Sequence, residues 1–232
     1  PTNPNIIYVA TAGGGVWKTN DQGLTWTPLT DNLPTLTSGA LAFDPTNPDI
    51  IYYGTGEMHY CLVCFPGDGL FKSSDGGNTW VKIASANQVG SYISRIIINP
   101  ITHRILVASD LGIVYSDDGG NTWLSSNISD QVNDVVYRSD SPNVLFAASL
   151  RTGIYKSIDG GSTWTKINNL PTSGYFRSQI AISNSNPNVI YVAFGSNNYY
   201  LYAFYKSTDG GNTWTQLNVP EYLCGQGFYN HA

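Results

Sequence analysis

The sequence has 232 residues and a formal net charge of −5, with only 12% of its residues charged. This composition excludes the basic surface that nucleic-acid binding needs, and it excludes a polybasic membrane-binding patch. No apolar run approaches the ~18 residues of a membrane-spanning helix, so no transmembrane segment is predicted. Apolar and aromatic residues occur along the whole chain, which indicates a folded protein with a substantial core.

Short strands separated by turns are predicted from the N-terminus onward. Residues 39–45, 49–55, 69–74 and 79–83 each indicate one strand, because they are rich in β-branched and aromatic residues and end in turn residues. The other repeats contain comparable segments at 6–11, 94–100, 104–109, 132–139, 143–149, 178–184 and 188–194. Four short antiparallel strands per repeat are typical of a β-propeller blade.

A box with the frame Ser/Thr-x-Asp-x-Gly-x-Thr-Trp lies between the third and fourth strands of each repeat. It occurs five times, and its aspartates are separated by 54, 43, 41 and 50 residues, a period typical of propellers. Asp, Asn and Gly at such a junction favour a tight turn, because the polar side chains bond nearby backbone and glycine accepts positive φ. We therefore interpret the boxes as structural, with their marker residues at Asp21, Trp26, Asp75, Trp80, Asp118, Trp123, Asp159, Trp164, Asp209 and Trp214.

The fold class predicted from these repeats is all-β, a β-propeller of about five four-stranded antiparallel blades in a single region over residues 1–232. The predicted blades cover about 1–30, 37–84, 92–125, 132–168 and 177–218, and a further strand is expected to start at 225–232. A larger propeller and a closed ring of these blades both remain open. We favour the larger propeller, because both ends of the sequence fall within a repeat unit.

The repeated frame resembles the Asp-box, or BNR repeat, of sialidases. Similar boxes occur in sortilin-type receptor propellers, in xyloglucanase-type glycoside hydrolases and in a photosystem assembly factor. Residues 15–26 (GVWKTNDQGLTW) and 44–56 (DPTNPDIIYYGTG) are similar to segments of secreted bacterial BNR-repeat proteins. The resemblance covers all five repeats and implies the propeller fold. It leaves the function open, because this fold serves hydrolases, receptors and scaffolds.

The strand order gives every blade two different edges. One edge holds the boxes and the other short, uniform turns, whereas the other holds the irregular loops, of which 55–69 and 195–204 are the longest. Because binding residues concentrate in variable loops on a rigid frame, we expect a ligand face at this loop edge. The candidate ligand-binding residues are Glu57, His59, Tyr60, Asp68, Tyr175, Arg177, Tyr199, Tyr200 and Tyr222.

Carboxylates on the loop edge raise the question of catalysis. Two carboxyl groups flanking one bond can hydrolyse a glycoside, and the candidates are Glu57, Asp68 and Glu221. The alternative, which we favour, is that they are solvated loop residues. The catalytic residues of sialidases are not transferred to this chain, because the RIP-type motif that precedes their repeats is absent. The catalytic aspartates of the xyloglucanase type are not matched either.

Three cysteines lie in the same loops, at Cys61, Cys64 and Cys224. A disulfide, an unpaired thiol and a zinc site completed by His59 are the alternatives, and a disulfide is favoured because the composition suits an oxidising compartment. The boxes lack the run of oxygen ligands that calcium needs. No cofactor and no metal site are predicted.

These features together predict a secreted or cell-surface propeller that binds a glycan or a surface protein through its loop edge. A role without catalysis is favoured. The alternative is a glycoside hydrolase, xyloglucanase- or sialidase-like, with catalytic residues partly outside this segment. Further blades or domains of the same chain are expected partners, and nucleic acid is not.

Overall fold

The computed structural model of the protein describes residues 3–58, 64–196, 198 and 200–218. The described residues form short strands in five sheets, and each sheet corresponds to one repeat of the sequence. This arrangement confirms the predicted all-β class, with antiparallel, propeller-like sheets.

Each sheet is built from strands that follow one another directly in the chain. Blade 1 contains β1 (Ile7–Thr11), β2 (Gly15–Thr19) and β3 (Thr27–Pro28). Blade 2 contains β4 (Ser38–Phe43), β5 (Ile51–Thr55), β6 (Leu70–Ser73) and β7 (Val81–Ala84). Blade 3 contains β8 (Ile93–Ile98), β9 (Ile105–Ser109), β10 (Gly112–Ser116) and β11 (Leu124–Ser125). Blade 4 contains β12 (Val132–Arg138), β13 (Ser141–Ser149), β14 (Ile154–Ser157) and β15 (Thr165–Lys166). Blade 5 contains β16 (Tyr175–Ile182), β17 (Ile190–Ser196), β18 (Leu201–Ser207) and β19 (Thr215–Gln216).

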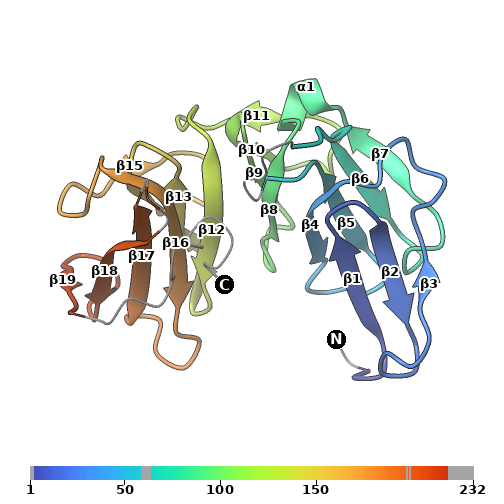
Figure 1. The fold of residues 1–232 in the computed structure, drawn as a ribbon, viewed down its shortest axis with the longest axis horizontal. Helices are drawn as coiled ribbons and strands as arrows, with labels where there is room; N and C mark the ends of the chain where they lie inside the picture. Colours follow the sequence, from blue (N-terminus) through green and yellow to red (C-terminus); the bar gives the residue numbers. More distant parts are fainter. Residues whose placement is uncertain (1–2, 59–63, 197, 199, 219–232) are drawn as a thin grey trace. The chain divides into compact units, whose positions relative to one another are not determined.

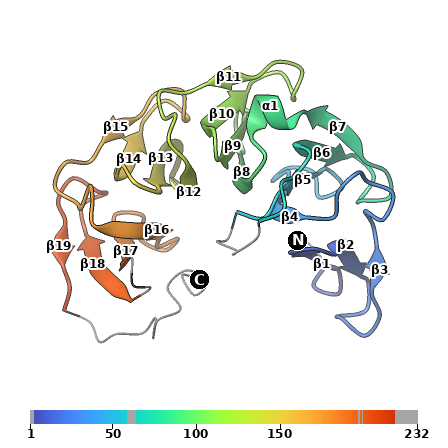
Figure 2. The same ribbon diagram turned by 45° about the horizontal axis from the view of Figure 1, so that its top comes forward.

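The chain divides into two compact units. Unit one comprises residues 1–110 and 116–123, and unit two comprises residues 111–115 and 124–232. Figure 1 shows the strands of blade 2 side by side in unit one, and Figure 2 shows those of blade 5 in unit two. The printed pairings within the sheets are antiparallel, as meandering connections require.

Both units have a core that lies between neighbouring sheets. In unit one, Val16 of blade 1 packs with Tyr53 and Phe71 of blade 2. In unit two, Phe146 of blade 4 packs with Ile190 and Phe194 of blade 5. These side chains are buried, and they come from strands of adjacent sheets that pack face to face. The blades are therefore held together mainly by burial of apolar surface.

The boxes form one hydrogen-bonded turn that recurs with the same partners. In the second box, the Asp75 carboxylate accepts hydrogen bonds from the Ser73 hydroxyl at 2.8 Å, the Thr79 amide at 2.9 Å and the Thr79 hydroxyl at 2.7 Å. The Ser73 hydroxyl in turn accepts the Gly77 amide at 2.8 Å. The same set of bonds occurs in the other four boxes. Each side chain that recurs in the frame thus takes the place of a backbone hydrogen-bond partner that the turn lacks.

Two local features differ from the sequence prediction. The fourth strands begin one residue after the box tryptophan, so the indole lies at the end of the turn instead of in the strand. A single helical turn, α1 (Ala86–Val89), connects blade 2 to blade 3, and its start is fixed by the Ser85 amide, which donates to the Gln88 side chain at 3.0 Å. This short turn was not predicted, because one turn of helix leaves no apolar period to detect.

Candidate functional site

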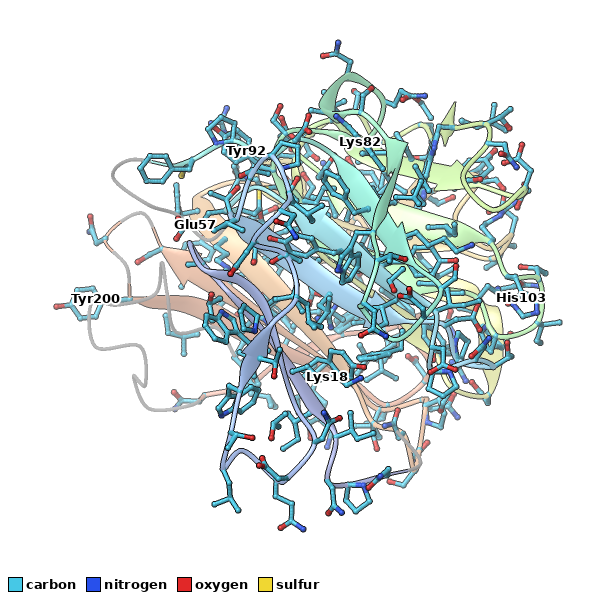
Figure 3. The ribbon with its side chains drawn as sticks, turned by 90° about the vertical axis from the view of Figure 1, so that its right-hand side faces the viewer. Lys18, Glu57, Lys82, Tyr92, His103 and Tyr200 are labelled. Carbon is cyan, nitrogen blue, oxygen red and sulfur yellow. The ribbon has the colours of Figure 1, made fainter. Side chains whose placement is uncertain are left out.

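The loop edge and the edge that holds the boxes and short turns, which we call the box edge, are separate surfaces in unit one. Figure 3 shows Glu57, from the β5–β6 loop, and Tyr92, from the loop before β8, at the same edge of the unit. His103, from the turn between β8 and β9, lies at the opposite edge. Within unit one, the irregular loops therefore share one edge, which is the arrangement that strand order predicts.

The two ends of the β5–β6 loop of blade 2, which we call its stems, are hydrogen-bonded to each other. The Thr55 hydroxyl donates to the Gly69 carbonyl at 2.7 Å and accepts the Asp68 amide at 2.8 Å. The Glu57 amide donates to the Phe65 carbonyl at 3.3 Å. The stems thus continue the pairing of β5 and β6 beyond the sheet, and they present Glu57 from a supported backbone.

Neighbouring connections clamp these stems from both sides. The Gly56 amide donates to the Thr37 carbonyl at 3.0 Å, and the Gly67 amide donates to the Ser91 carbonyl at 2.8 Å. Gly56 has a φ of +91°, and a Cβ at this position would lie 1.9 Å from the Ser91 oxygen. Only glycine fits here, because the backbone of the next connection occupies the space of a side chain. The base of the loop is therefore a rigid platform shared by three connections.

The two carboxylates of this loop have different surroundings. Asp68 forms an ion pair with Lys82 on β7, and both side chains are about one-third exposed at 36%. Glu57 is half-buried, and no hydrogen bond or ion pair engages its carboxylate within the described part of the chain. Only Glu57 of this pair is consequently available to a ligand without breaking an existing ion pair.

Three further residues complete the described surface near Glu57. Cys64 is disulfide-bonded. Phe65, its neighbour in the second stem, is 59% exposed. Tyr92 is fixed through its backbone, since its amide donates to the Asp110 carboxylate at 3.0 Å and its carbonyl accepts the Asp110 amide at 3.2 Å. An exposed ring and a carboxylate that no described residue engages, on two paired stems of one loop, suit a ligand that has both apolar faces and hydroxyl groups.

The candidates of unit two occupy a different environment. Tyr175, at the start of β16, is only 6% exposed, packs edge-on against Phe194 at 4.8 Å and makes no well-formed hydrogen bond through its hydroxyl. Burial raises the pKa of the Tyr175 phenol well above its usual value. Arg177 is 8% exposed; burial lowers its pKa, while the negative charge of Asp134 acts against that shift. Both residues belong to the packed interior of unit two, whereas Tyr200, the other candidate that the structure describes there, lies on its surface and is 50% exposed.

Sequence reasoning missed a polar network at the loop edge of blade 4. The Asp130 carboxylate accepts hydrogen bonds from the Ser149 hydroxyl and from the Arg151 amide and the Thr152 hydroxyl, the last two at 3.3 Å. The Tyr155 hydroxyl donates to the Thr152 hydroxyl at 2.9 Å. The only signal in the sequence is an Asp two residues before a predicted strand, which is too common to single out. These bonds fix the β13–β14 turn.

Several candidates lie outside the described residues. They are His59, Tyr60, Cys61, Tyr199, Glu221, Tyr222 and Cys224. The pairing of Glu57 with Glu221 and the partner of Cys64 therefore stay predictions. Within the residues that the structure describes, no group of three or more His, Cys, Asp and Glu side chains could hold a metal ion. No described helix is long and apolar enough to cross a membrane.

Two arginines at the box edge are paired with aspartates. Arg104 makes a two-point ion pair with Asp117, at 2.6 and 2.9 Å, and Arg138 makes one with Asp140, at 3.0 and 2.9 Å. The Arg104 pair joins the β8–β9 turn to the third box, and the Arg138 pair lies within the β12–β13 turn.

The chain matches no family model. It is 29% identical over 192 residues to a xyloglucanase of Paenibacillus sp, a match that covers 75% of this chain and 16% of that protein. Among solved structures, an ancestral GH74 enzyme superposes with a TM-score of 0.74 and 24% identity, over 94% of this chain and 30% of the enzyme.

A second solved structure, of a shorter protein than the GH74 enzyme, shows the same fold. YCF48 from Cyanidioschyzon merolae superposes with a TM-score of 0.56 and 15% identity, over 93% of this chain and 81% of that one. The chain spans less than a fifth of the Paenibacillus xyloglucanase. The chain thus has the repeats and the fold of a BNR-repeat β-propeller, and it is similar over most of its length to propellers of the GH74 xyloglucanase type and to YCF48.

Proposed function

We propose that the chain is the part of a glycoside hydrolase propeller that binds a xyloglucan-type polysaccharide at its loop edge. Three quarters of the chain aligns with a xyloglucanase at 29% identity, which favours the hydrolase over the non-catalytic role that we expected from the sequence. Such a polysaccharide lies outside cells, so the proposal includes a secreted or cell-surface location. The activity belongs to the whole protein, of which this chain is a segment.

The observation that carries the proposal is the state of Glu57. Its half-buried carboxylate, free of hydrogen bonds within the described residues, projects from a loop that neighbouring backbone holds in place. Catalysis and ligand orientation both need a group whose position is set before the substrate arrives. We assign Glu57 to the contact with substrate, either as one of two catalytic carboxylates or as an acceptor for sugar hydroxyls.

Asp68 is proposed to support this face without reacting. Its ion pair with Lys82 turns it toward β7, on the outer side of the blade. Because glycoside hydrolysis needs a second carboxylate across the bond, that group must come from elsewhere in the protein. Glu221 is the candidate within this sequence.

The state of the Glu57 carboxylate also favours a second function, glycan binding without cleavage. If no second carboxylate faces Glu57, the loop edge binds a glycan and does not cleave it. Exposed Phe65 and Tyr200 then supply the apolar contacts, each in its own unit. The two functions share the ligand and differ only in turnover.

The test measures turnover and binding on the same variants of the natural protein. We would follow release of reducing sugar from xyloglucan, and retention in native gels that contain xyloglucan, for Glu57→Gln and Phe65→Ala. If Glu57 is catalytic, its variant loses about 100-fold or more in turnover and keeps its retention. If the edge only binds, no turnover occurs and both variants migrate faster.

Asp117→Asn is the matched control. It removes a carboxylate of blade 3 at the box edge, where Asp117 is paired with Arg104, and it should change neither turnover nor retention. Wild-type behaviour of Glu57→Gln and Phe65→Ala in both assays would refute the assignment of this edge. The wild-type protein could instead fail to bind or cleave xyloglucan and be retained by a different polysaccharide. That result would show that the proposed substrate is wrong and that the loop edge is still the binding surface.

A further inference from the structure

A lysine lies over an aromatic ring in four of the five blades. The pairs are Lys18 over Tyr8, Lys72 over Tyr52, Lys156 over Phe146 and Lys206 over Tyr191, with the ammonium 5.1 to 5.6 Å from the ring centre. In every case the two residues are direct cross-strand neighbours, on β1 and β2 in blade 1 and on the second and third strands in blades 2, 4 and 5. We call such a pair a lysine–ring pair.

Two of these pairs hold the box of the blade that follows. Lys18 donates to the Gly76 carbonyl at 3.4 Å, and the Tyr8 hydroxyl donates to the same oxygen at 2.9 Å. Lys156 donates to the Gly210 carbonyl at 3.0 Å. In both boxes, the acceptor is the glycine directly after the box aspartate. The lysine–ring pair of one blade thus receives the turn of the next blade.

The second glycine of the box completes this contact. A Cβ on Gly211 would lie 2.6 Å from the Phe146 ring, so a bare backbone packs directly on the ring of the preceding blade. Phe146 is fully buried as a result. The contact has a polar part, from lysine to carbonyl, and an apolar part, from ring to glycine.

Not every lysine–ring pair makes the polar part of the contact. Lys72 donates to no carbonyl of the third box, which is held instead by the Trp123 indole through a 3.4 Å bond to the Ile83 carbonyl. The ring of Tyr52 is buried nevertheless. This pair provides an internal reference, because it has the same residues without the hydrogen bond.

Blade 5 carries a complete pair that receives no box among the described residues. Lys206 lies 5.5 Å from the centre of the Tyr191 ring, and Phe204 stacks on that ring at 5.7 Å. Tyr191 is only half-buried, whereas the equivalent Phe146 of blade 4 is fully buried under blade 5. An aromatic stack beside an ammonium that bonds to no carbonyl of the described residues can make both the polar and the apolar part of the contact.

We propose that Tyr191 and Lys206 dock the Asp-box of a further blade of the same, longer protein. Lys206 donates to the carbonyl of the first glycine after that box's aspartate, and the second glycine packs on Tyr191. The length of the relatives supports this occupant, because the chain covers only 30% of the GH74 enzyme that it superposes on.

The test compares three lysine variants, Lys206→Met, Lys156→Met and Lys72→Met, in the natural longer protein and in the 232-residue chain. Lys156→Met should lower the Tm of the 232-residue chain by about 2–4 °C, the effect of one lost hydrogen bond in a domain of this size. Lys206→Met should leave the Tm of that chain unchanged and destabilise the longer protein as Lys156→Met does. Lys72→Met should have little effect in either.

Lysine labelling gives a second readout that needs no variant. An amine-acetylating reagent should modify Lys206 readily in the 232-residue chain and slowly in the longer protein, where its rate should fall at least tenfold toward that of Lys156. The proposal would be overturned if Lys206 were labelled equally in both proteins and Lys206→Met left the Tm of the longer protein unchanged. A dimer of the 232-residue chain that Lys206→Met abolishes would overturn the chosen occupant and assign the surface to a second copy.

Discussion

The box edge and the loop edge of the blades are built by opposite means. At the box edge, five turns repeat one set of hydrogen bonds, and all the partners of each aspartate lie within six residues of it. At the loop edge, the stems of the β5–β6 loop are held by Thr37 and Ser91, which belong to other connections. The conformation of the box edge is thus set by residues within each repeat, whereas that of the loop edge depends on residues from neighbouring connections.

The strongest challenge to this comparison is a pair of glycine variants. Gly56→Ala at the loop edge places a Cβ against the Ser91 oxygen at a φ of +91°, and it should lower the free energy of unfolding by about 2–5 kcal/mol. Gly119→Ala at the box edge has a φ of +76° and nothing within 4 Å of the added Cβ, so its cost should be about 1–2 kcal/mol. Urea unfolding of both variants measures the difference, and equal losses would contradict the clamped loop.

Acid should weaken the box edge. The Thr79 and Thr122 hydroxyls lower the pKa of Asp75 and Asp118 from 3.8 to about 2, and the Thr19 hydroxyl does the same for Asp21. A carboxylate whose pKa is lower in the folded state stabilises the protein above the unfolded pKa and loses that effect as the pH falls through the folded one. The Tm should therefore drop between about pH 4 and pH 2.

One variant separates this effect from the general repulsion of an acidified protein. Asp118→Asn removes one titrating box, so its Tm should start lower at neutral pH and decline less between about pH 4 and pH 2. Asp31→Asn, which changes an exposed aspartate outside the boxes, should keep the wild-type decline. A decline that is the same in all three proteins would show that the boxes do not set the acid limit.

The smallest expected effect is that of Glu57→Gln on stability. Because no described residue bonds its carboxylate, the free energy of unfolding should change by less than about 0.5 kcal/mol. Thermal unfolding of the same preparation used for the xyloglucan assays would measure it. A loss above about 1 kcal/mol would place Glu57 in the fold instead of the site.

The sequence predicted the box edge well, because every partner of a box aspartate is encoded nearby. It also predicted which edge holds the irregular loops, since that follows from strand order alone. It did not predict that Asp68 is paired while no described residue engages the Glu57 carboxylate, because Lys82 lies 14 residues away from Asp68 on an outer strand. Nor did it predict that Tyr175 and Arg177 are buried, since their cover comes from the packing of blade 4 against blade 5.

The interface between blades 1 and 2 is bonded in both directions. The Trp80 indole of blade 2 donates back to the Leu29 carbonyl at 3.1 Å, while Lys18 of blade 1 donates forward to the Gly76 carbonyl at 3.4 Å. A shift of either blade by one residue would break both bonds together. In evolution, such a gene can be lengthened or shortened only by duplicating or deleting whole blades, which accounts for the near-verbatim copies of one phrase along this sequence.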